Sequence, residues 1–493
     1  MKDDFNPYDR IGVRTFINCC GTRTIHGGTL MLPDVKRAME AAANHFVNID
    51  ELMEGVGRRI ATLTGAEWGI VTSGAAAALC HATAACVAGA DPEKILRLPN
   101  TTGLKDRVVM LKDGRFTYDH AVRMTGVEIQ EVETCRDLSR ALDERVAMVA
   151  LLGTREAQEA GRLEEIAGLT RPLGIPILVD AASEHLIRPN PYLTRGATMV
   201  AYSGGKYLRG PQCSGLLLGE RAWVQAAWVN SAPHHTFGRA MKVGKEEIVG
   251  LLAAVEHWAS ARDHEAERAQ WEADLAVIAR EVTRVPTVMA EVQRSEGSPA
   301  PVPRLEVRWD GDRVGWTALA LRDRLLEGEP RIMLDDRRAT DTSLFILPFS
   351  LQPGEAERVG SRIREALEAA PGNPRKASLP PVHIEGIWDV EIQYLRGASR
   401  HCLALEQRGH ELTGLHRTSF QENSLSGHVQ GAEVTFSSLH RFEGTSLSYQ
   451  FTGTVDRDVM EGTVELGSTG QEALGPLNQR EYGQGQWQAR RRT

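Results

Sequence analysis

A lysine and an aspartate, each beside an apolar run, are the residues of this chain best suited to covalent chemistry. Lys206 follows the β-like run at 197–201 and lies in a turn flanked by glycines. Asp180 ends the apolar run at 175–179. A lysine amine in a tight turn can form a Schiff base with the aldehyde of pyridoxal phosphate (PLP), and a nearby acid can keep the pyridine nitrogen protonated. The pair therefore predicts a PLP site with Lys206 and Asp180 as its catalytic residues, although either residue alone would suit an ordinary loop or a helix cap.

A phosphate-binding turn is predicted upstream of this pair. The strand-like run at 68–72 is followed by Ser73 and Gly74, and then by an alanine-rich helix that begins near Ala75. The first N–H groups of a helix are unpaired and carry partial positive charge, so they bind phosphate well. We expect Ser73, Gly74 and Ala75 to contact the cofactor phosphate, with a further hydroxyl from Ser203. A phosphate site, an acid and a lysine follow each other in this order in fold-type I PLP enzymes.

Several longer motifs carry a resemblance to one branch of those enzymes. They are residues 17–22 with His26, 63–67 leading into 71–77, Tyr118-Asp119-His120-Ala121 before Gly126, Ser203-Gly204-Gly205-Lys206 through Gly210-Pro211-Gln212, and 238–247. With these motifs the chain resembles the selenocysteine synthase branch, which holds the L-seryl-tRNA(Sec) selenium transferases. Within that branch it looks closer to the D-glucosaminate-6-phosphate ammonia-lyase type. The resemblance covers roughly residues 10 to 370.

Two positions depart from the pattern of the transferases. They carry an acid before the cofactor lysine, where this chain has Gly205, and a glycine before the Gly-Pro-Gln motif, where it has Arg209. Both departures speak against selenium chemistry.

PLP chemistry also calls for a group that stacks on the cofactor ring and for cations that bind an acidic substrate. Tyr118 and His120 are the candidates for stacking. The candidate substrate-binding residues are His26, Arg239, Lys242 and Arg331. Cations bind carboxylates well, although each of these could equally form a surface salt bridge or have a structural role.

Composition narrows the classes of function. The 493 residues carry a net charge of −8 with a pI near 6.1, which argues against a nucleic-acid partner such as tRNA. No run of eighteen apolar residues and no signal-peptide pattern occurs, so we expect a cytoplasmic protein without a membrane partner. The seven cysteines include no CxxC pair, and we expect no metal. Cys80 and Cys86 are read as core residues.

Apolar runs alternate with helical patterns between about 66 and 230, at 68–72, 108–111, 127–132, 147–152, 175–179, 197–201 and 214–218. This alternation predicts a parallel sheet with helices on both faces. The predicted fold class is α/β, a fold-type I (aspartate aminotransferase-like) enzyme with large and small domains and a C-terminal antiparallel β-barrel or sandwich. The expected segments are an N-terminal arm with helices (1–65), a large PLP-binding domain (66–264), a small α/β domain (265–370), a linker (371–381) and the β-domain (382–493). In the small domain we expect strands near 304–307 and 343–347 and a final helix at 354–369.

The β-domain is predicted from period-two patterning after a proline-rich stretch. We expect Trp388 and Trp487 to be core aromatics. Four histidines, His401, His410, His416 and His428, could gather as a site, but scattered positions on polar faces are the preferred interpretation.

The sequence leaves three classes of function open. The first is a PLP enzyme acting on a small amino acid or amino sugar acid, either a lyase or a racemase or epimerase. The second is a selenium-transferase-like enzyme on aminoacyl-tRNA, and the third is a binding protein without catalysis. We expect the first, in a homodimer or higher homo-oligomer, with the glycine-rich loop at 21–30 near the cofactor of the neighbouring subunit.

Overall fold

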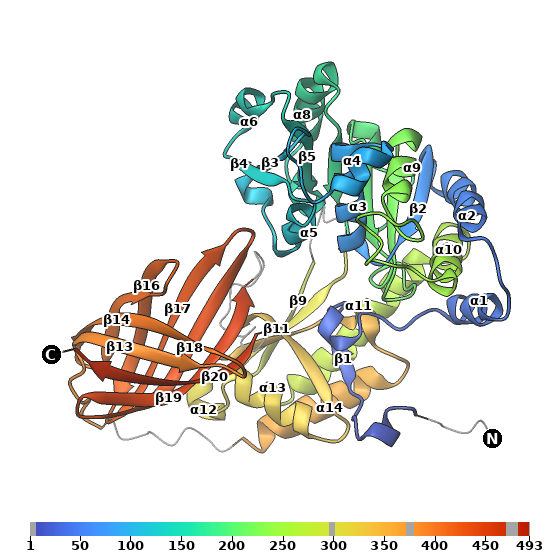
Figure 1. The fold of residues 1–493 in the computed structure, drawn as a ribbon. Helices are drawn as coiled ribbons and strands as arrows, with labels where there is room; N and C mark the ends of the chain where they lie inside the picture. The colour runs from blue at the N-terminus through green and yellow to red at the C-terminus, as the bar shows by residue number, and fades with distance from the viewer. Residues whose placement is uncertain (1–5, 295–300, 371–378, 470–481, 493) are drawn as a thin grey trace. The chain divides into compact units, whose positions relative to one another are not determined.

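A computed structural model describes residues 6–294, 301–370, 379–469 and 482–492 of the chain. The chain forms two compact units (Figure 1). The first contains Met1–Glu281, Glu291–Leu305 and Ile346–Gly360, and the second contains Val282–Ala290, Glu306–Phe345 and Ser361–Thr493. Residues 371–378 of the predicted linker lie outside the described residues, so the predicted domain limits stay a proposal.

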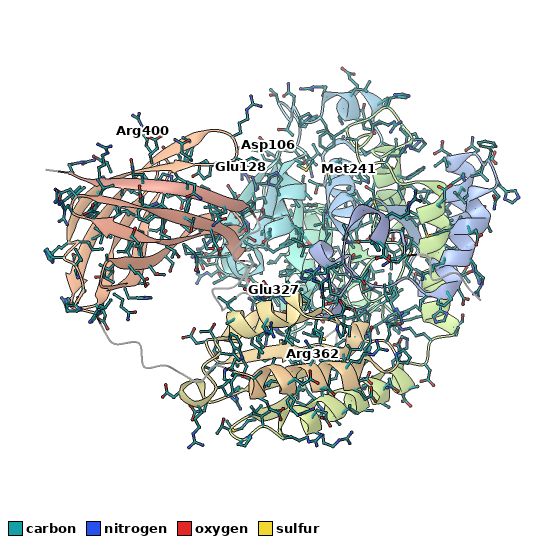
Figure 2. All side chains as sticks on the ribbon, turned by 90° about the horizontal axis from the view of Figure 1, so that it is seen from below. Asp106, Glu128, Met241, Glu327, Arg362 and Arg400 are labelled. Atoms are coloured by element: carbon teal, nitrogen blue, oxygen red, sulfur yellow. The ribbon has the colours of Figure 1, made fainter. Side chains whose placement is uncertain are left out.

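The apolar runs of the first unit form a seven-stranded sheet in the order β2-β8-β7-β6-β5-β3-β4. Asp106 and Glu128, beside the starts of β3 and β4, mark its amino-terminal edge (Figure 2). The predicted strands are confirmed to within two residues at each end. They are β2 (Trp68–Thr72), β3 (Arg107–Leu111), β4 (Glu128–Val132), β5 (Val146–Leu152), β6 (Ile177–Asp180), β7 (Met199–Ser203) and β8 (Gly215–Gly219).

The prediction of an all-parallel sheet is wrong for one strand. β8 pairs antiparallel with both β7 and β2, whereas the other neighbouring strands pair in parallel. The connection between β7 and β8, residues 204–214, contains no helix. A parallel pair needs a crossover of a dozen or more residues, usually helical, so this short loop returns the chain in the opposite direction. The same loop carries the predicted cofactor lysine.

One helix of the first unit is apolar on all sides. In α3 (Ala75–Ala88) all residues from Ala77 to Ala88 are buried, including Cys80 and Cys86 as predicted, and α3 packs against β5, β6, β7 and β8. In the described ranges no helix is both long and apolar enough to cross a membrane. The other helices are α1 (Pro33–Ala43), α2 (Ile49–Thr64), α4 (Pro92–Arg97), α5 (His120–Arg123), α6 (Cys135–Ala141), α7 (Gly153–Glu156), α8 (Arg162–Thr170), α9 (Arg221–Val229), α10 (Lys245–Ser260) and α11 (His264–Val282).

The region predicted as the small domain contains the expected strands and helix. Here β11 (Ile332–Thr340) and β12 (Ser343–Ile346) form an antiparallel hairpin, and α13 (Ala318–Glu327) packs against β11. The remaining elements are β1 (Ile17–Cys19), β9 (Met289–Gln293), β10 (Arg304–Arg308), α12 (Gly311–Val314) and α14 (Glu355–Glu368).

The C-terminal strands form a closed antiparallel barrel, which confirms the predicted β-barrel. Trp388 and Trp487 lie in its core, 0% and 2% exposed, whereas Arg400 points outward (Figure 2). Alternation of buried and exposed residues along the strands accounts for this arrangement. The strands are β13 (Gly386–Gln393), β14 (Ala398–Arg408), β15 (Glu411–Arg417), β16 (Glu422–Gln430), β17 (Glu433–Phe442), β18 (Thr445–Asp456), β19 (Val459–Thr469) and β20 (Gly483–Arg491).

The expectation of scattered histidines on polar faces is wrong for two of the four. His401 and His416 are buried inside the barrel, and the Nδ1 of His401 lies 2.7 Å from the Nε2 of His416. His440, which the sequence prediction missed, adds a third ring 3.1 Å from the Nδ1 of His416. His410 and His428 are exposed and lie elsewhere on the barrel, as the sequence predicts. Within the described part of the chain, no set of three His, Cys, Asp or Glu residues is arranged to hold a metal ion.

Candidate active site

The parts of the predicted site lie at one edge of the large sheet. Gly215 of β8 pairs with Thr72 of β2 on one side and with Ser203 of β7 on the other, and Asp180 of β6 pairs with Ala201 of β7. The chain therefore leaves β2, β6 and β7 at the same edge, which is the carboxyl edge where open α/β sheets bind their ligands. The predicted phosphate turn, acid and lysine follow these strand ends.

Lys206 lies in the β7–β8 loop, with its side chain directed to the loop after β6. Its Nζ donates a hydrogen bond to the Oγ of Ser183 over 2.7 Å. The loop is closed by backbone bonds from the Gly204 N–H to the Ser214 carbonyl (2.9 Å) and from the Gly210 N–H to the Gly204 carbonyl (2.8 Å). Because these bonds fix the backbone, the amine is held beside the end of β6.

The N-terminal arm covers the backbone of this lysine. Thr29 Oγ1 donates to the carbonyl oxygens of Gly205 and Lys206, each at 3.2 Å. Gly28 has a φ of +68°, and a Cβ there would lie 2.8 Å from the Gly205 carbonyl oxygen. Only glycine combines this φ with this close approach at low cost. His26 lies in the same arm, on the short helix η2 (Thr24–His26), so the arm brings it to the neighbourhood of the loop.

Asp180 is buried, with 6% of its surface exposed, and its Oδ1 accepts the Ala182 N–H at 2.8 Å. Burial raises the pKa of this carboxyl, while the Ala182 N–H and the positive charge of Lys206 act in the opposite direction. A cationic group bound beside it would favour the ionised form. The burial of Asp180 at the end of β6 fits the predicted pairing with a protonated ring nitrogen.

The turn at 73–75 has the geometry of an anion site. Gly74 adopts a φ of +116° and precedes α3, and Ser73 Oγ donates to the Met241 carbonyl at 3.0 Å (Met241 is labelled in Figure 2). A Cβ on Gly215 would lie 2.3 Å from the Gly74 carbonyl carbon. The glycine of β8 therefore lets the turn lie directly on the sheet, with the N-terminus of α3 above it.

The two stacking candidates follow the carboxyl end of β3. Tyr118 lies on the short helix η4 (Thr117–Asp119) and is 55% exposed. His120 begins α5, and its Nδ1 lies 3.2 Å from the Nη2 of Arg123. Between them, Asp119 is buried and pairs with Arg115, Nε to Oδ2 at 2.7 Å. This buried pair anchors the segment at the same edge of the sheet and leaves the Tyr118 ring accessible.

The predicted substrate cations do not all lie in the same unit. Arg239 and Lys242 are exposed on the segment between α9 and α10, on either side of Met241, which contacts the phosphate turn. Arg331 belongs to the second unit, where its Nε donates to the Leu326 carbonyl at 2.7 Å.

Two residues next to Asp180 were missed from the sequence. Ser183 accepts the hydrogen bond of Lys206. Glu184 is 4% exposed, and its Oε2 lies 2.6 Å from the hydroxyl of Tyr192. The sequence signal was the short polar pair that follows Asp180-Ala181-Ala182, since residues directly after a strand of a parallel sheet lie at the ligand-binding edge.

The chain is similar in sequence to known enzymes. No family model matches the chain. It is 30% identical over 376 residues to D-glucosaminate-6-phosphate ammonia lyase of Salmonella typhimurium, a match that covers 74% of this chain and 99% of that protein. It is also 30% identical over 380 residues to a 5′-C-glycyluridine monooxygenase-decarboxylase of a Streptomyces species, covering 74% of this chain and 93% of that protein.

More distant similarity reaches the selenium transferases. An L-seryl-tRNA(Sec) selenium transferase of Proteus mirabilis is 24% identical over 258 residues, which cover 46% of this chain and 54% of that protein. Among solved structures, D-glucosaminate-6-phosphate ammonia-lyase superposes with a TM-score of 0.65 at 28% identity, covering 74% of this chain and 99% of that one. The two matches to D-glucosaminate-6-phosphate ammonia lyase cover nearly its whole length and 74% of this chain, and they show that this part of the chain has the same fold.

Proposed function

Because this chain belongs to the fold-type I, PLP-dependent enzyme family of D-glucosaminate-6-phosphate ammonia lyase, in the selenocysteine synthase-like branch, we propose that it is a lyase that releases ammonia from an amino acid or an amino sugar acid. The observation that carries the proposal is the set of Lys206, Ser183 and Asp180 at the carboxyl edge of the sheet. It stands in a chain that matches nearly the whole length of an ammonia lyase.

The residues at this edge fit the cofactor. In the proposal the Lys206 amine binds it covalently, the buried Asp180 carboxylate pairs with its ring nitrogen, and Ser73, Gly74 and Ala75 bind its phosphate. The helix N-terminus at Ala75 and the close approach of Gly215 to Gly74 support the phosphate assignment. When bound, PLP supplies a conjugated ring that accepts the electrons released at the substrate α-carbon.

Lys206 has a second role in the proposal, as the group that moves a proton at the substrate α-carbon. Its hydrogen bond to Ser183 supports this role because the hydroxyl fixes the amine in one direction. Asp180 favours a positive charge nearby. Ser203, at the end of β7, adds a hydroxyl for the phosphate, and Tyr118 or His120 covers the ring of the cofactor.

Anionic groups of the substrate would bind at the segment that carries Arg239 and Lys242. Both side chains are exposed, and the Met241 carbonyl between them in sequence accepts the Ser73 hydroxyl, so the backbone that carries the two cations contacts the phosphate turn. His26 in the glycine-rich arm is a further candidate for a substrate contact. Arg331 remains a candidate carboxylate ligand from the second unit.

Two experiments test the cofactor and the reaction. The purified protein should absorb in the visible range after addition of PLP, and Lys206→Ala should abolish that band, whereas the exposed Lys94→Ala should keep it. A normal band in Lys206→Ala would contradict the assignment. Amino acids and amino sugar acids are then screened for release of ammonia and a 2-oxo acid.

The second candidate reaction is racemisation or epimerisation, because it also begins with removal of the α-proton. Chiral analysis of the substrate left in the same screen separates the two. Inversion without ammonia would favour the epimerase. A selenium-transferase-like reaction is disfavoured by Gly205 and by the net charge of −8.

We also propose that the protein is a homodimer or a higher homo-oligomer in the cytoplasm. Among the described residues of the N-terminal part, Ile11, Ile25, Leu30 and Phe46 are exposed, and Phe46 is fully so. Burial in a symmetric interface would remove such surface from water. A mass measurement in solution tests this, with Phe46→Ser expected to weaken the association, and a monomer at full activity would contradict it.

A further inference from the structure

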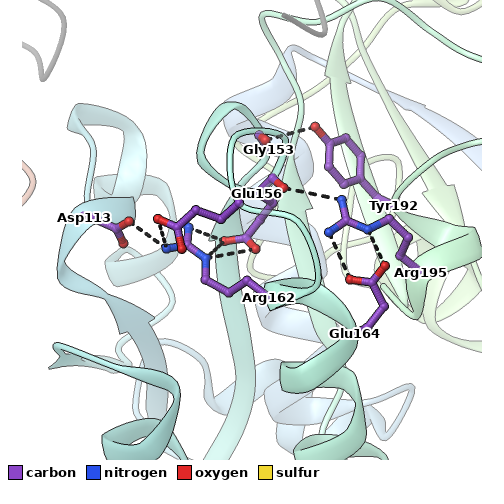
Figure 3. A network of polar contacts seen from close by, with 8 residues as sticks. Asp113, Gly153, Glu156, Arg162, Glu164, Tyr192 and Arg195 are labelled. Atoms are coloured by element: carbon purple, nitrogen blue, oxygen red, sulfur yellow. Dashed lines mark hydrogen bonds and ion pairs between the residues drawn. The ribbon is translucent and has the colours of Figure 1, made fainter. Parts of the chain in front are cut away.

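A tyrosine hydroxyl lies between two oxygens, the carbonyl of Gly153 and the carboxyl of Glu184. The hydroxyl oxygen of Tyr192 is 3.0 Å from the Gly153 carbonyl oxygen, as Figure 3 shows, and 2.6 Å from Glu184 Oε2. A phenol has one proton to donate, and a carbonyl has none. Two separate hydrogen bonds, each with its own proton, form at once only if Tyr192 donates to Gly153 and Glu184 donates to Tyr192; otherwise the two oxygens share the single proton of Tyr192. In the first arrangement Glu184 is a neutral carboxylic acid.

The surroundings of Glu184 favour the same state. The side chain is 4% exposed, and among the described residues its other oxygen, Oε1, has no hydrogen-bond partner. Burial, followed by the negative charge of Asp180, raises the pKa of Glu184 to about 8, although a hydrogen bond that Tyr192 can donate to the ionised carboxylate opposes the shift. Tyr202 is the other titratable group that interacts with it, and its hydroxyl accepts a bond from Asn190 at 2.8 Å. An unpartnered, buried carboxylate oxygen is costly when charged.

Glu184 also shapes the segment that presents Ser183 to the lysine. The Glu184 N–H bonds to the Ala181 carbonyl at 3.0 Å, which closes the turn after Asp180. Its carboxyl group lies against Gly153, where a Cβ would be 2.3 Å from Oε1. The carboxyl group therefore ties the turn of β6 to the end of β5.

We propose that Glu184 is a positioning residue that acts as a neutral acid, donating its proton to Tyr192 so that the turn carrying Ser183 is fixed without a second negative charge beside Asp180. This inference rests on the proposed PLP-dependent function for its consequence, but not for its geometry. If Glu184 ionised, the Tyr192 hydroxyl would turn to donate its proton to the carboxylate, and the Gly153 carbonyl would lose its donor. The added charge would also favour the ammonium form of Lys206.

The protonation state is measured first, without substrate or cofactor. Infrared difference spectra of the full chain, wild type minus Glu184→Gln, should contain the band of a protonated carboxylic acid at pH 7, and this band should disappear with a midpoint near pH 8. The matched control is Glu164→Gln, since Glu164 is half-exposed and pairs with Arg195 (Figure 3). Its difference spectrum should contain only a carboxylate band. A carboxylate band for Glu184 at pH 7 would overturn the inference.

The second measurement separates positioning from simple stability. With PLP bound, kcat of the wild type should fall above about pH 8, and Glu184→Gln, which keeps a donor and a neutral group, should lack that fall. Tyr192→Phe should lower kcat more than tenfold with less change in KM, because the turn loses its tie to Gly153. An unaltered alkaline limb in Glu184→Gln would refute the role. A protein that never takes up PLP would refute the proposed function instead, and the infrared result would still decide the state of Glu184.

Discussion

Acid should destabilise the C-terminal barrel, because three of its buried histidines have to remain neutral in the fold. His401 Nε2 lies 2.8 Å from the Ser399 hydroxyl, and His416 Nδ1 lies 2.6 Å from the Ser438 hydroxyl. With the contacts of His416 to His401 and His440, the rings form one continuous chain. Neutral rings satisfy these bonds because each has one donor and one acceptor. A protonated ring would place two donors against each other and bury a charge.

The size of the expected loss in the free energy of unfolding follows from the pKa shifts of the buried histidines. Burial first, and then the neighbouring rings, lowers the pKa of His401 to about 4 and that of His416 to about 2. The unfolded chain has a histidine pKa of about 6.5, so between that pH and the folded pKa the unfolded state binds more protons. The free energy of unfolding is therefore complete above pH 6.5 and falls as the pH drops. At pH 4.5 the loss is about 2 to 3 kcal/mol for each ring and about 5 kcal/mol for the pair, against a typical total of about 5–15 kcal/mol.

Hydrogen exchange of the full chain, followed by mass spectrometry of peptides, measures this loss. Peptides from β13–β20 should lose protection between pH 7 and pH 4.5 after correction for intrinsic exchange, while peptides from β2–β8 report the first unit as an internal control. His401→Gln removes one of the two strongly shifted groups, so about half of the acid effect should disappear. Equal pH dependence in this variant and the wild type, or flat protection of the barrel down to pH 4.5, would refute the reasoning.

Three further predictions concern the cofactor site. Asp180→Ala should bind PLP more weakly and lose most activity, and near-normal turnover would mean that the partner acid lies elsewhere. Gly215→Ala should weaken PLP binding about tenfold or more, or by about 1.4 kcal/mol, because its Cβ would lie 2.3 Å from Gly74; the control Gly55→Ala, with open space at its Cβ, should bind normally. A chain that ends at Ala370 should still show the PLP band, and its loss from a folded truncation would show that the barrel is part of the site.

The parts of the fold that local sequence determines were predicted well. The buried strands β5, β6 and β7 are continuous apolar runs, and each run ends where a small or polar residue begins the loop. The location of Lys206 and Asp180 at one edge of the sheet could be predicted because the end of a strand in a parallel sheet has a known location. The direction of β8 was missed, since it depends on the length and content of the β7–β8 connection rather than on the run itself.

The sequence does contain a signal that His401 and His416 point into the barrel. His401 shares its parity with Leu403 and Leu405, and His416 shares it with Leu412, so period-two alternation alone turns both rings into the barrel. The contact between the rings is a different matter. It requires that β14 and β15 pair with Leu403 opposite His416, and register is set by the whole barrel rather than by either strand.

The burial and the protonation state of Glu184 could not be predicted from the local sequence pattern. Its position, four residues after a candidate catalytic aspartate, suggests an exposed loop residue, since glutamate is rarely buried. Glu184 is a neutral acid because Tyr192 has a single proton to donate. Tyr192 lies 39 residues from Gly153 in sequence, and its hydroxyl oxygen lies 3.0 Å from the Gly153 carbonyl oxygen. No periodicity or motif encodes that count of donors and acceptors. The count can be made only in the folded chain, where the turn after β6, the end of β5 and the segment before β7 lie together. There the number of available protons, rather than the residue type, determines whether Glu184 is charged.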